Sequence, residues 1–204
     1  MNTICLKVLV LGDSGVGKTS LVRRYVKGEF GMDFITTMGV DFHMKTVRAK
    51  QPVKLTIYDV AGQRRFRKIV YQYFRGTNGT LIAFERSDAE GFAAIRQWLE
   101  MARSYASDVP VVLVETKSDV SQELSAVSQA EIDQLCTELG CQCVQTSAKS
   151  GDGVEQAFKL LIDLMLENLA KHGHATRDLL SNSGMDDVVI LGSSSSAAKP
   201  SCCY

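Results

Sequence analysis

The chain has 204 residues, of which 45% are hydrophobic, 23% are charged and 7% are aromatic. This composition is typical of a globular domain and excludes wholesale disorder, a collagen repeat and a disulfide scaffold, and the length suffices for one hydrophobic core. The 23 basic and 23 acidic residues leave no net charge, so no overall field attracts the molecule to nucleic acid or to an anionic membrane.

The N-terminal part of the chain predicts three strands and a helix. Residues 5–11 form an apolar run of strand length, and residues 19–27 place apolar side chains three and four apart, as a helix with one buried face does. Apolar and polar residues alternate over residues 40–47, which predicts a half-exposed, antiparallel edge strand. Residues 53–58 predict a further buried strand.

The following part alternates between strand and helix patterns. Strands are predicted at residues 80–84, 111–115 and 141–145, and helices at residues 92–105, 129–139 and 154–169. Such alternation predicts an α/β fold, in which a mixed but mostly parallel sheet of six strands has helices on both faces. From His172 onward the periodicity fades, so we expect residues 1–172 to form one domain and residues 173–204 to form a flexible tail.

A phosphate-binding motif follows the first strand. Residues 12–19 read Gly-Asp-Ser-Gly-Val-Gly-Lys-Thr, which satisfies the pattern G-x-x-x-x-G-K-[ST] between a strand and a helix. The glycines allow the backbone to curl so that successive N–H groups point inward, above the positive end of the helix. Lys18 supplies a cation for the β- and γ-phosphates, and the Thr19 hydroxyl can ligate magnesium. The motif alone does not distinguish GTP from ATP, or a hydrolase from a kinase.

Two polar segments at predicted strand ends favour guanine over adenine. Residues 116–119 read Thr-Lys-Ser-Asp and residues 146–149 read Thr-Ser-Ala-Lys, at the sheet edge where open α/β sheets bind ligands. The Asp119 carboxylate can accept hydrogen bonds from N1–H and the 2-amino group of guanine, whereas adenine would leave it unpaired. The backbone N–H of Ala148 would suit the guanine O6. Residues 116–119 alone read equally well as a plain polar loop, so the inference depends on both segments together.

With these motifs, the sequence resembles the small GTPases of the Ras superfamily, and within them the Rab family, over about residues 6–168. The further Rab-like stretches are Met38-Gly39-Val40-Asp41-Phe42, Lys54-Leu55-Thr56-Ile57-Tyr58-Asp59-Val60-Ala61-Gly62-Gln63, Arg65-Phe66-Arg67, Tyr73-Phe74-Arg75-Gly76 and the terminal Ser-Cys-Cys-Tyr. The resemblance implies the P-loop GTPase fold, binding of GTP and GDP with Mg²⁺, and slow hydrolysis of GTP to GDP and phosphate.

The resemblance also implies a set of site residues. Thr37 would ligate Mg²⁺ and sense the γ-phosphate, and Asp59 would hold the same ion. Gly62 would bring its N–H close to the γ-phosphate, and Gln63 would be the catalytic residue that orients the attacking water. Phe30 would pack against the guanine ring. The residues expected around the nucleotide are Asp13, Ser14, Gly15, Val16, Gly17, Lys18, Thr19, Ser20, Phe30, Thr37, Gly62, Thr116, Lys117, Asp119, Ser147, Ala148 and Lys149, with Mg²⁺ on Thr19, Thr37 and Asp59.

The mechanism implied is a molecular switch. Thr37 and Gly62 would each touch the γ-phosphate, so GTP holds both loops in one arrangement and hydrolysis releases them. The output is the recruitment of effector proteins in vesicle-mediated membrane traffic. One alternative is a nucleotide-binding pseudo-GTPase with impaired hydrolysis, which the intact Gln63 and Thr37 disfavour. Another is an ATP-dependent P-loop kinase, for which we find no sequence that predicts a lid or a second substrate pocket.

The sequence departs from the Rab pattern near the predicted guanine-binding residues and in the segment after Gln63. Thr116 stands where the family usually has Asn, so one hydroxyl replaces an amide, and we expect retained guanine selectivity with faster nucleotide exchange. Residues 64–68 (Arg-Arg-Phe-Arg-Lys) are unusually basic, and form either a solvated face or a surface that selects acidic regulators. Residues 85–87 (Glu-Arg-Ser) replace the Asp-containing strand end that is usual in Rab proteins.

The C-terminus resembles the double-cysteine Rab terminus, which implies geranylgeranyl groups on Cys202 and Cys203. At roughly 0.8 kcal/mol per buried CH₂, one lipid binds reversibly and two hold firmly. We find no spanning apolar run and no signal sequence, so we expect the cytoplasmic face of an endomembrane compartment and a soluble cytosolic pool. Expected partners are effectors, an exchange factor, a GTPase-activating protein, and escort and dissociation-inhibitor proteins. We expect a monomer that binds no nucleic acid.

Overall fold

The computed structural model describes residues 3–31, 37–48, 52–63, 71–105, 108–120 and 125–182, with side chains described as far as Lys171. The chain divides into a unit of residues 1–168 and a unit of residues 169–204. The basic stretch at residues 64–68 and the terminal Cys202 and Cys203 lie outside the described residues. No helix within the described ranges is both long enough and apolar enough to cross a membrane.

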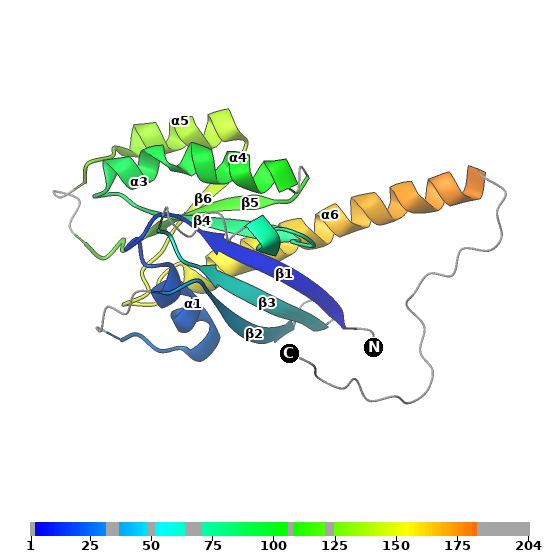
Figure 1. Ribbon diagram of the computed structural model, residues 1–204, viewed down its shortest axis with the longest axis horizontal. Coiled ribbons are helices and arrows are strands. Elements are labelled where there is room, and N and C mark those ends of the chain that lie inside the picture. Colours follow the sequence, from blue (N-terminus) through cyan, green and yellow to red (C-terminus); the bar gives the residue numbers. More distant parts are fainter. Residues whose placement is uncertain are drawn as a thin grey trace. The chain divides into compact units, whose positions relative to one another are not determined.

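A six-stranded sheet forms the centre of the first unit, in the order β2-β3-β1-β4-β5-β6 (Figure 1). Its strands are β1 (Ile4–Leu11), β2 (Val40–Arg48), β3 (Pro52–Val60), β4 (Gly79–Glu85), β5 (Val111–Thr116) and β6 (Gln142–Gln145). Neighbouring strands are parallel except β2 and β3, which pair antiparallel at one edge. The predicted mixed, mostly parallel sheet is therefore confirmed.

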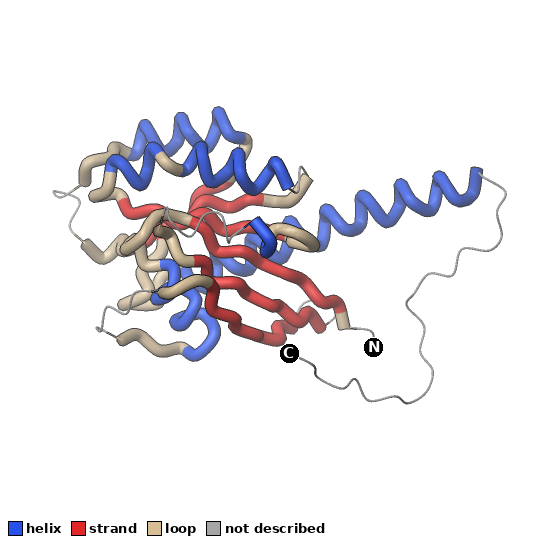
Figure 2. Tube along the Cα trace, in the orientation of Figure 1, coloured by secondary structure: helices blue, strands red, loops and turns tan. Residues whose placement is uncertain are grey.

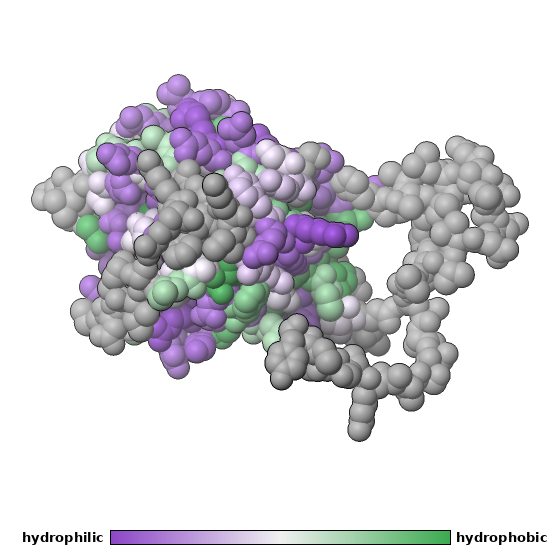
Figure 3. Space-filling model, in the orientation of Figure 1, coloured by the Kyte–Doolittle hydropathy of each residue, from purple (hydrophilic) through white to green (hydrophobic). Residues whose placement is uncertain are grey.

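Helices cover both faces of this sheet. They are α1 (Lys18–Lys27), α3 (Ala89–Ala93), α4 (Ile95–Tyr105), α5 (Gln129–Leu139) and α6 (Val154–Asn182), with a 3₁₀ turn η2 (Tyr71–Tyr73). Side chains alternate along β1: Val8 and Val10 pack with α1 and α6, whereas Leu9 and Leu11 pack with α4 and α5 on the other face. Figure 2 shows the strands between these helices, and Figure 3 shows a mostly hydrophilic outer surface over α4 and α5.

Two helices differ from the prediction, while α5 has the predicted bounds. The helix expected over residues 92–105 is divided at Ala94, and it starts earlier because the Asp88 side chain accepts the Gly91 N–H at 2.9 Å and caps α3. The last helix continues from the predicted Leu169 to Asn182. The prediction ended the helix where the apolar periodicity ends, but that periodicity marks a buried face and does not mark the end of helical backbone. Residues 170–182 contain only one glycine and no proline that would end the helix.

Candidate functional site

Residues 12–17 connect β1 to α1 and have the curled backbone that the motif predicts. Gly12, Gly15 and Gly17 have φ values of 134°, 85° and 92°, which other residues rarely adopt. A Cβ on Gly12 would also overlap the carbonyl oxygen of Ala83 on β4. The helix begins at Lys18 with no side-chain cap, so the N–H groups of its first turn are suited to binding an anion.

Lys18 lies buried at the base of this loop. Its Nζ donates to the Asp13 carbonyl oxygen at 2.6 Å. Burial lowers the pKa of Lys18 to about 8, although the nearby Asp59 and Asp13 carboxylates act in the opposite direction. A buried cation of this kind gains most from a neighbouring anion, and a phosphate group would supply one.

Oxygen atoms from three separate elements converge beside Lys18. Thr19 Oγ1 on α1 lies 2.7 Å from Thr37 Oγ1 and donates to Asp59 Oδ2, at the end of β3, at 2.5 Å. Burial raises the pKa of Asp59, and its Oδ1 has no hydrogen-bond partner within the described part of the chain. Because a buried, unpaired carboxylate oxygen is costly unless a cation compensates it, this arrangement fits a metal ion.

The donor set fits Mg²⁺ in particular. Two hydroxyls and one carboxylate are hard oxygen donors, and Mg²⁺ takes only one or two carboxylates while phosphate oxygens and water complete its octahedral shell. The described residues contain no group of three or more His, Cys, Asp or Glu side chains that could hold a metal by themselves. The three residues predicted for Mg²⁺, Thr19, Thr37 and Asp59, are thus brought together.

Gly62 and Gln63 follow β3 next to the phosphate loop. A Cβ on Gly62 would overlap the backbone of Gly12 and Asp13, so the two backbones are in direct contact. The Ala61 N–H donates to the Gly39 carbonyl oxygen at 2.9 Å, which joins the segment after β3 to the segment before β2. These are the two segments that the sequence predicts to sense a γ-phosphate.

Two adjoining cavities contain most of the predicted site. One is lined on the phosphate side by Ser14, Gly15, Lys18, Thr19, Thr37 and Gly62, and the other on the base side by Thr116, Asp119, Ala148 and Lys149. Gly17, Ser20, Phe30 and Lys117 line both, so the cavities share a wall. Asp13, Val16, Asp59, Gln63 and Ser147 do not line either cavity. Ser147 and Asp59 instead lie behind lining residues, where they contact Asp119 and Thr19.

Thr116 connects the base side to the phosphate loop. Its hydroxyl lies 2.5 Å from the Val16 carbonyl oxygen and 2.9 Å from the Phe84 carbonyl oxygen. A hydroxyl has one hydrogen, so these two acceptors share a single donor, whereas an amide would offer two. Thr116 thus braces the phosphate loop against β4 with one donor hydrogen, where an amide would have two.

Asp119 is oriented by its neighbours in the opposite loop. Its Oδ1 accepts from Ser147 Oγ at 2.6 Å, and its Oδ2 lies 4.0 Å from Lys149 Nζ. Arg24 on α1 holds that loop in turn, because its guanidinium donates to the carbonyl oxygens of Ala148 at 2.5 Å and Lys149 at 2.6 Å. The carboxylate therefore has a fixed position from which to meet a base.

Several residues of the site were missed in the sequence. Arg24 is one, and Trp98 is another, since its Nε1 donates to Asp13 Oδ1 at 2.8 Å. Glu85 pairs with Lys117 at 2.5 Å, and Arg86 pairs with Glu115 at 2.8 Å. Each contact joins residues far apart along the chain, so no local motif reveals it. The unusual charged strand end at residues 85–87 was the one available signal.

In a comparison with known protein families, residues 7–167 match the model of the Ras family. The chain is 36% identical over 200 residues to Ras-related protein SEC4 of Saccharomyces cerevisiae, an alignment that covers 97% of this chain and 91% of SEC4. It is 36% identical over 200 residues to Ras-related protein RABE1e of Arabidopsis thaliana, covering 97% and 92%. It is 33% identical over 203 residues to Ras-related protein Rab-27A of Rattus norvegicus, covering 86% and 91%.

Proposed function

Since the chain belongs to the Ras family, as a Rab-like small GTPase, we propose that its nucleotide binds in the adjoining cavities between the phosphate loop and Asp119. As such a protein it binds GTP and GDP with Mg²⁺, hydrolyses GTP to GDP and phosphate, and acts with effectors and regulators in vesicle traffic. The observation that carries the site is the convergence of oxygen atoms from Thr19, Thr37 and Asp59 beside the buried Lys18.

The phosphates would lie over the N-terminus of α1. This part of the cavity is lined by Ser14, Gly15, Gly17, Lys18, Thr19 and Ser20, and Lys18 Nζ would exchange the Asp13 carbonyl oxygen for phosphate oxygens. Mg²⁺ neutralises charge on the phosphate oxygens when bound, and Thr19, Thr37 and Asp59 would hold it.

Gln63 is the residue that we assign to hydrolysis. It directly follows Gly62, whose backbone contacts the phosphate loop, so its side chain begins beside the position of a γ-phosphate. An amide can accept a hydrogen bond from water and donate one to a phosphate oxygen, which orients the water for attack. Phosphoryl transfer depends on such positioning, so no strong base is required. The relatives give no support to the pseudo-GTPase alternative.

Guanine would lie between Asp119 and the half-exposed ring of Phe30. Asp119 would accept from N1–H and the 2-amino group, while Ser147 and Lys149 hold the carboxylate in place. The Ala148 N–H would donate to O6. Adenine would leave the Asp119 carboxylate facing an acceptor, which accounts for selectivity.

The γ-phosphate would hold the segments that contain Thr37 and Gly62 in one arrangement. The Ala61 to Gly39 hydrogen bond already joins these segments, so phosphate contacts at both ends would stabilise the joined state. Hydrolysis removes those contacts and favours a looser state.

An aromatic cluster borders both segments and is the surface that we assign to effectors. Phe42 on β2, Tyr58 on β3 and Tyr73 in η2 have ring centroids 4.8 to 6.0 Å apart, and Phe42 is 53% exposed. Neighbouring aromatic side chains of which one is exposed and two are partly buried, as here, are typical of interaction sites. A change in the adjoining segments would alter what a partner meets there.

The protein associates peripherally with endomembranes, as a Rab-like chain does. We assign the attachment to geranylgeranyl groups on Cys202 and Cys203, because two lipids anchor firmly where one does not. Residues 1–172 would then form the GTPase domain and residues 173–204 the membrane-attached tail. We propose a monomer that exchanges between the cytoplasmic face of the membrane and a cytosolic pool with the help of escort and dissociation-inhibitor proteins. An exchange factor and a GTPase-activating protein would control its nucleotide state.

The proposed site is tested by single-turnover hydrolysis of bound GTP. We expect Gln63→Leu to slow hydrolysis about 100-fold, since losing the alignment of the attacking water costs on that order, while GTP affinity stays within about twofold. Gln142→Leu, at an exposed position of β6, is the matched control and should hydrolyse GTP at the normal rate. Unchanged hydrolysis in Gln63→Leu would remove Gln63 from the mechanism, and equal binding of ATP and GTP in competition would remove Asp119 from base selection.

A further inference from the structure

Two ion pairs cross between the ends of β4 and β5, next to the segment that would bind the base. In the sheet, Glu85 on β4 lies opposite Thr116 on β5. Arg86 Nη2 reaches back to Glu115 Oε2 at 2.8 Å, and Lys117 Nζ reaches Glu85 Oε2 at 2.5 Å. Glu115 and Lys117, on either side of Thr116, are therefore each paired with a charged residue. Glu115 pairs with Arg86, just beyond the end of β4, and Lys117 pairs with Glu85, the last residue of β4.

Of these two ion pairs, Arg86–Glu115 is the more buried. Its side chains are 13% and 5% exposed, whereas those of the Arg96–Glu138 pair, which joins α4 to α5, are 52% and 48% exposed. A buried pair adds little net stability compared with an apolar pair of the same volume. It does penalise any movement that separates the charges, because each would then be buried without a partner. Burial thus makes this pair a constraint on where the end of β5 can lie.

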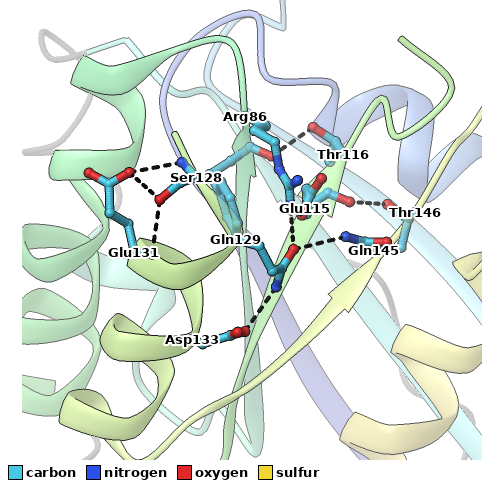
Figure 4. Close-up of polar contacts among 10 residues, drawn as sticks. Arg86, Glu115, Thr116, Ser128, Gln129, Glu131, Asp133, Gln145 and Thr146 are labelled. Atoms are coloured by element: carbon cyan, nitrogen blue, oxygen red, sulfur yellow. Dashed lines mark hydrogen bonds and ion pairs between the residues drawn. The ribbon is translucent and has the colours of Figure 1, made fainter. Parts of the chain in front are cut away.

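Arg86 extends the constraint into the segment that enters α5. The same Nη2 donates to Gln129 Oε1 at 2.5 Å, and Gln129 Nε2 donates to Asp133 Oδ1 at 2.9 Å (Figure 4). The Arg86 carbonyl oxygen accepts the backbone N–H groups of Ala126 at 3.0 Å and Val127 at 3.2 Å. One residue therefore fixes the chain on both sides of residues 116–119.

Glu115 connects the constraint to the second base-binding loop. Its carbonyl oxygen accepts both the Thr146 N–H at 2.7 Å and the Thr146 hydroxyl at 3.0 Å (Figure 4). The Ser118 N–H in turn donates to the Thr146 carbonyl oxygen at 3.0 Å. The loop that carries Ser147 and Ala148 is therefore attached to the residue that Arg86 holds.

Arg86 and Glu115 do not line the cavities assigned to the nucleotide. They line a small separate cavity on the other side of residues 116–118, together with Ser87, Ser125 and Gln145. Any influence of this pair on a bound base must therefore be indirect, either through residues 116–119 or through the Thr146 loop that Glu115 holds.

We infer that Arg86 and Glu115 are positioning residues for guanine recognition, an inference that rests on the proposed function. The buried pair, anchored at Gln129 and Thr146, sets the position of Asp119 relative to Ala148 and thereby the rate of nucleotide release. Because Asp119 would accept from the 2-amino group of guanine, its position determines how well GDP is held compared with IDP, whose hypoxanthine base lacks that group.

The test is the dissociation rate of radiolabelled GDP and IDP from the full chain with Mg²⁺. We expect Arg86→Met to raise GDP release about tenfold and IDP release about threefold, so that the preference for GDP falls about threefold, as the loss of one well-placed hydrogen bond predicts. Arg96→Met, which removes the arginine of the exposed pair, should leave both rates unchanged.

A double variant separates positioning from stability. Arg86→Met with Glu115→Leu removes both charges and leaves no buried charge unpaired, so it should unfold at a temperature close to that of the parent. We expect it still to lose the preference for GDP over IDP, because no directional side-chain contact then joins residue 115 to residue 86. A parental ratio of the two rates in the double variant would overturn the inference. Failure of the parent chain to bind GDP would instead refute the proposed function.

Discussion

On the phosphate side of the cavity, the backbone of one short segment provides the binding groups, whereas the base side is assembled from side chains at three strand ends. Residues 12–19 take their shape mainly from glycine conformations and the start of α1, to which Trp98 and Thr116 add one hydrogen bond each. Thr116, Lys117 and Asp119 instead depend on partners such as Glu85 and Ser147, from other parts of the chain.

The difference determines how each side can vary. A backbone cradle tolerates few substitutions, because Gly12 and Gly62 have no room for a Cβ. A side-chain assembly can be rebuilt from other residues, provided that charges remain paired and hydrogen bonds are satisfied. The base side is accordingly one place where the chain departs from the Rab pattern, at Thr116 and at residues 85–87.

The largest expected effect is on folding stability, and it would test whether the base side depends on its buried pair. Arg86→Met leaves the Glu115 carboxylate buried without its partner, which costs about 3 kcal/mol or more in the free energy of unfolding. Urea denaturation at fixed GDP and Mg²⁺ concentrations measures this loss. The loss for Arg96→Met should be far smaller, since that pair is solvated. Equal losses in the two variants would contradict the contrast between buried and exposed pairs.

Nucleotide affinity tests the phosphate side most directly. Lys18→Met removes the buried cation, and we expect GTP to bind about 100-fold more weakly, because charge-assisted hydrogen bonds contribute about 1.5–3 kcal/mol each. Equilibrium dialysis measures the change, and Lys159→Met on the exposed face of α6 is the control. An affinity within twofold of the parent would show that the backbone cradle alone carries the phosphates.

The hydroxyl of Thr116 joins the two sides, so its removal should affect release and not selectivity. Thr116→Val keeps the shape and leaves the Val16 and Phe84 carbonyl oxygens without this donor, and we expect GDP release about tenfold faster. Thr116→Asn restores an amide and should slow release. Competition with ATP tests the selectivity, because ATP should not displace GDP from either variant while Asp119 remains. Slower release in Thr116→Val would contradict the bracing role.

The smallest expected effect is a pH dependence of binding. Burial lowers the pKa of Lys18 to about 8 in the free protein, and a bound phosphate would raise it, so binding takes up a proton above pH 8 and affinity falls as pH rises. Between pH 7 and pH 8.5 the decrease should be about fourfold. Titration calorimetry in buffers of different ionisation enthalpy would show the proton uptake. A pH-independent affinity in this window would indicate that Lys18 is charged throughout.

Much of the fold follows from local patterns, and the exceptions have physical causes. The six strands and the bounds of α5 were predictable, because alternation and periodicity record burial within each element, and Ser128 and Gly140 mark the ends of that helix. The break at Ala94 and the continuation of α6 to Asn182 were not, since neither changes the apolar pattern.

The residues of the site also fall into those that local patterns reveal and those that they do not. The phosphate loop and the Mg²⁺ residues could be named from motifs and a resemblance, whereas the contacts of Arg24, Trp98 and Arg86 could not. An arginine after a strand carries no sign of its partner, because the register that brings β4 beside β5 is a property of the whole sheet. Charged residues at a strand end are the sequence feature that indicates such a pairing.

Trp98 is the one tryptophan of the chain, and it is 1% exposed while its indole N–H donates to Asp13 in the phosphate loop. The emission of an indole depends on the hydrogen bond at its nitrogen and on nearby charge. A rearrangement of the loop that alters this hydrogen bond is therefore expected to change the emission of a single intrinsic fluorophore. We expect this signal to follow nucleotide occupancy with unmodified nucleotides and without an attached dye.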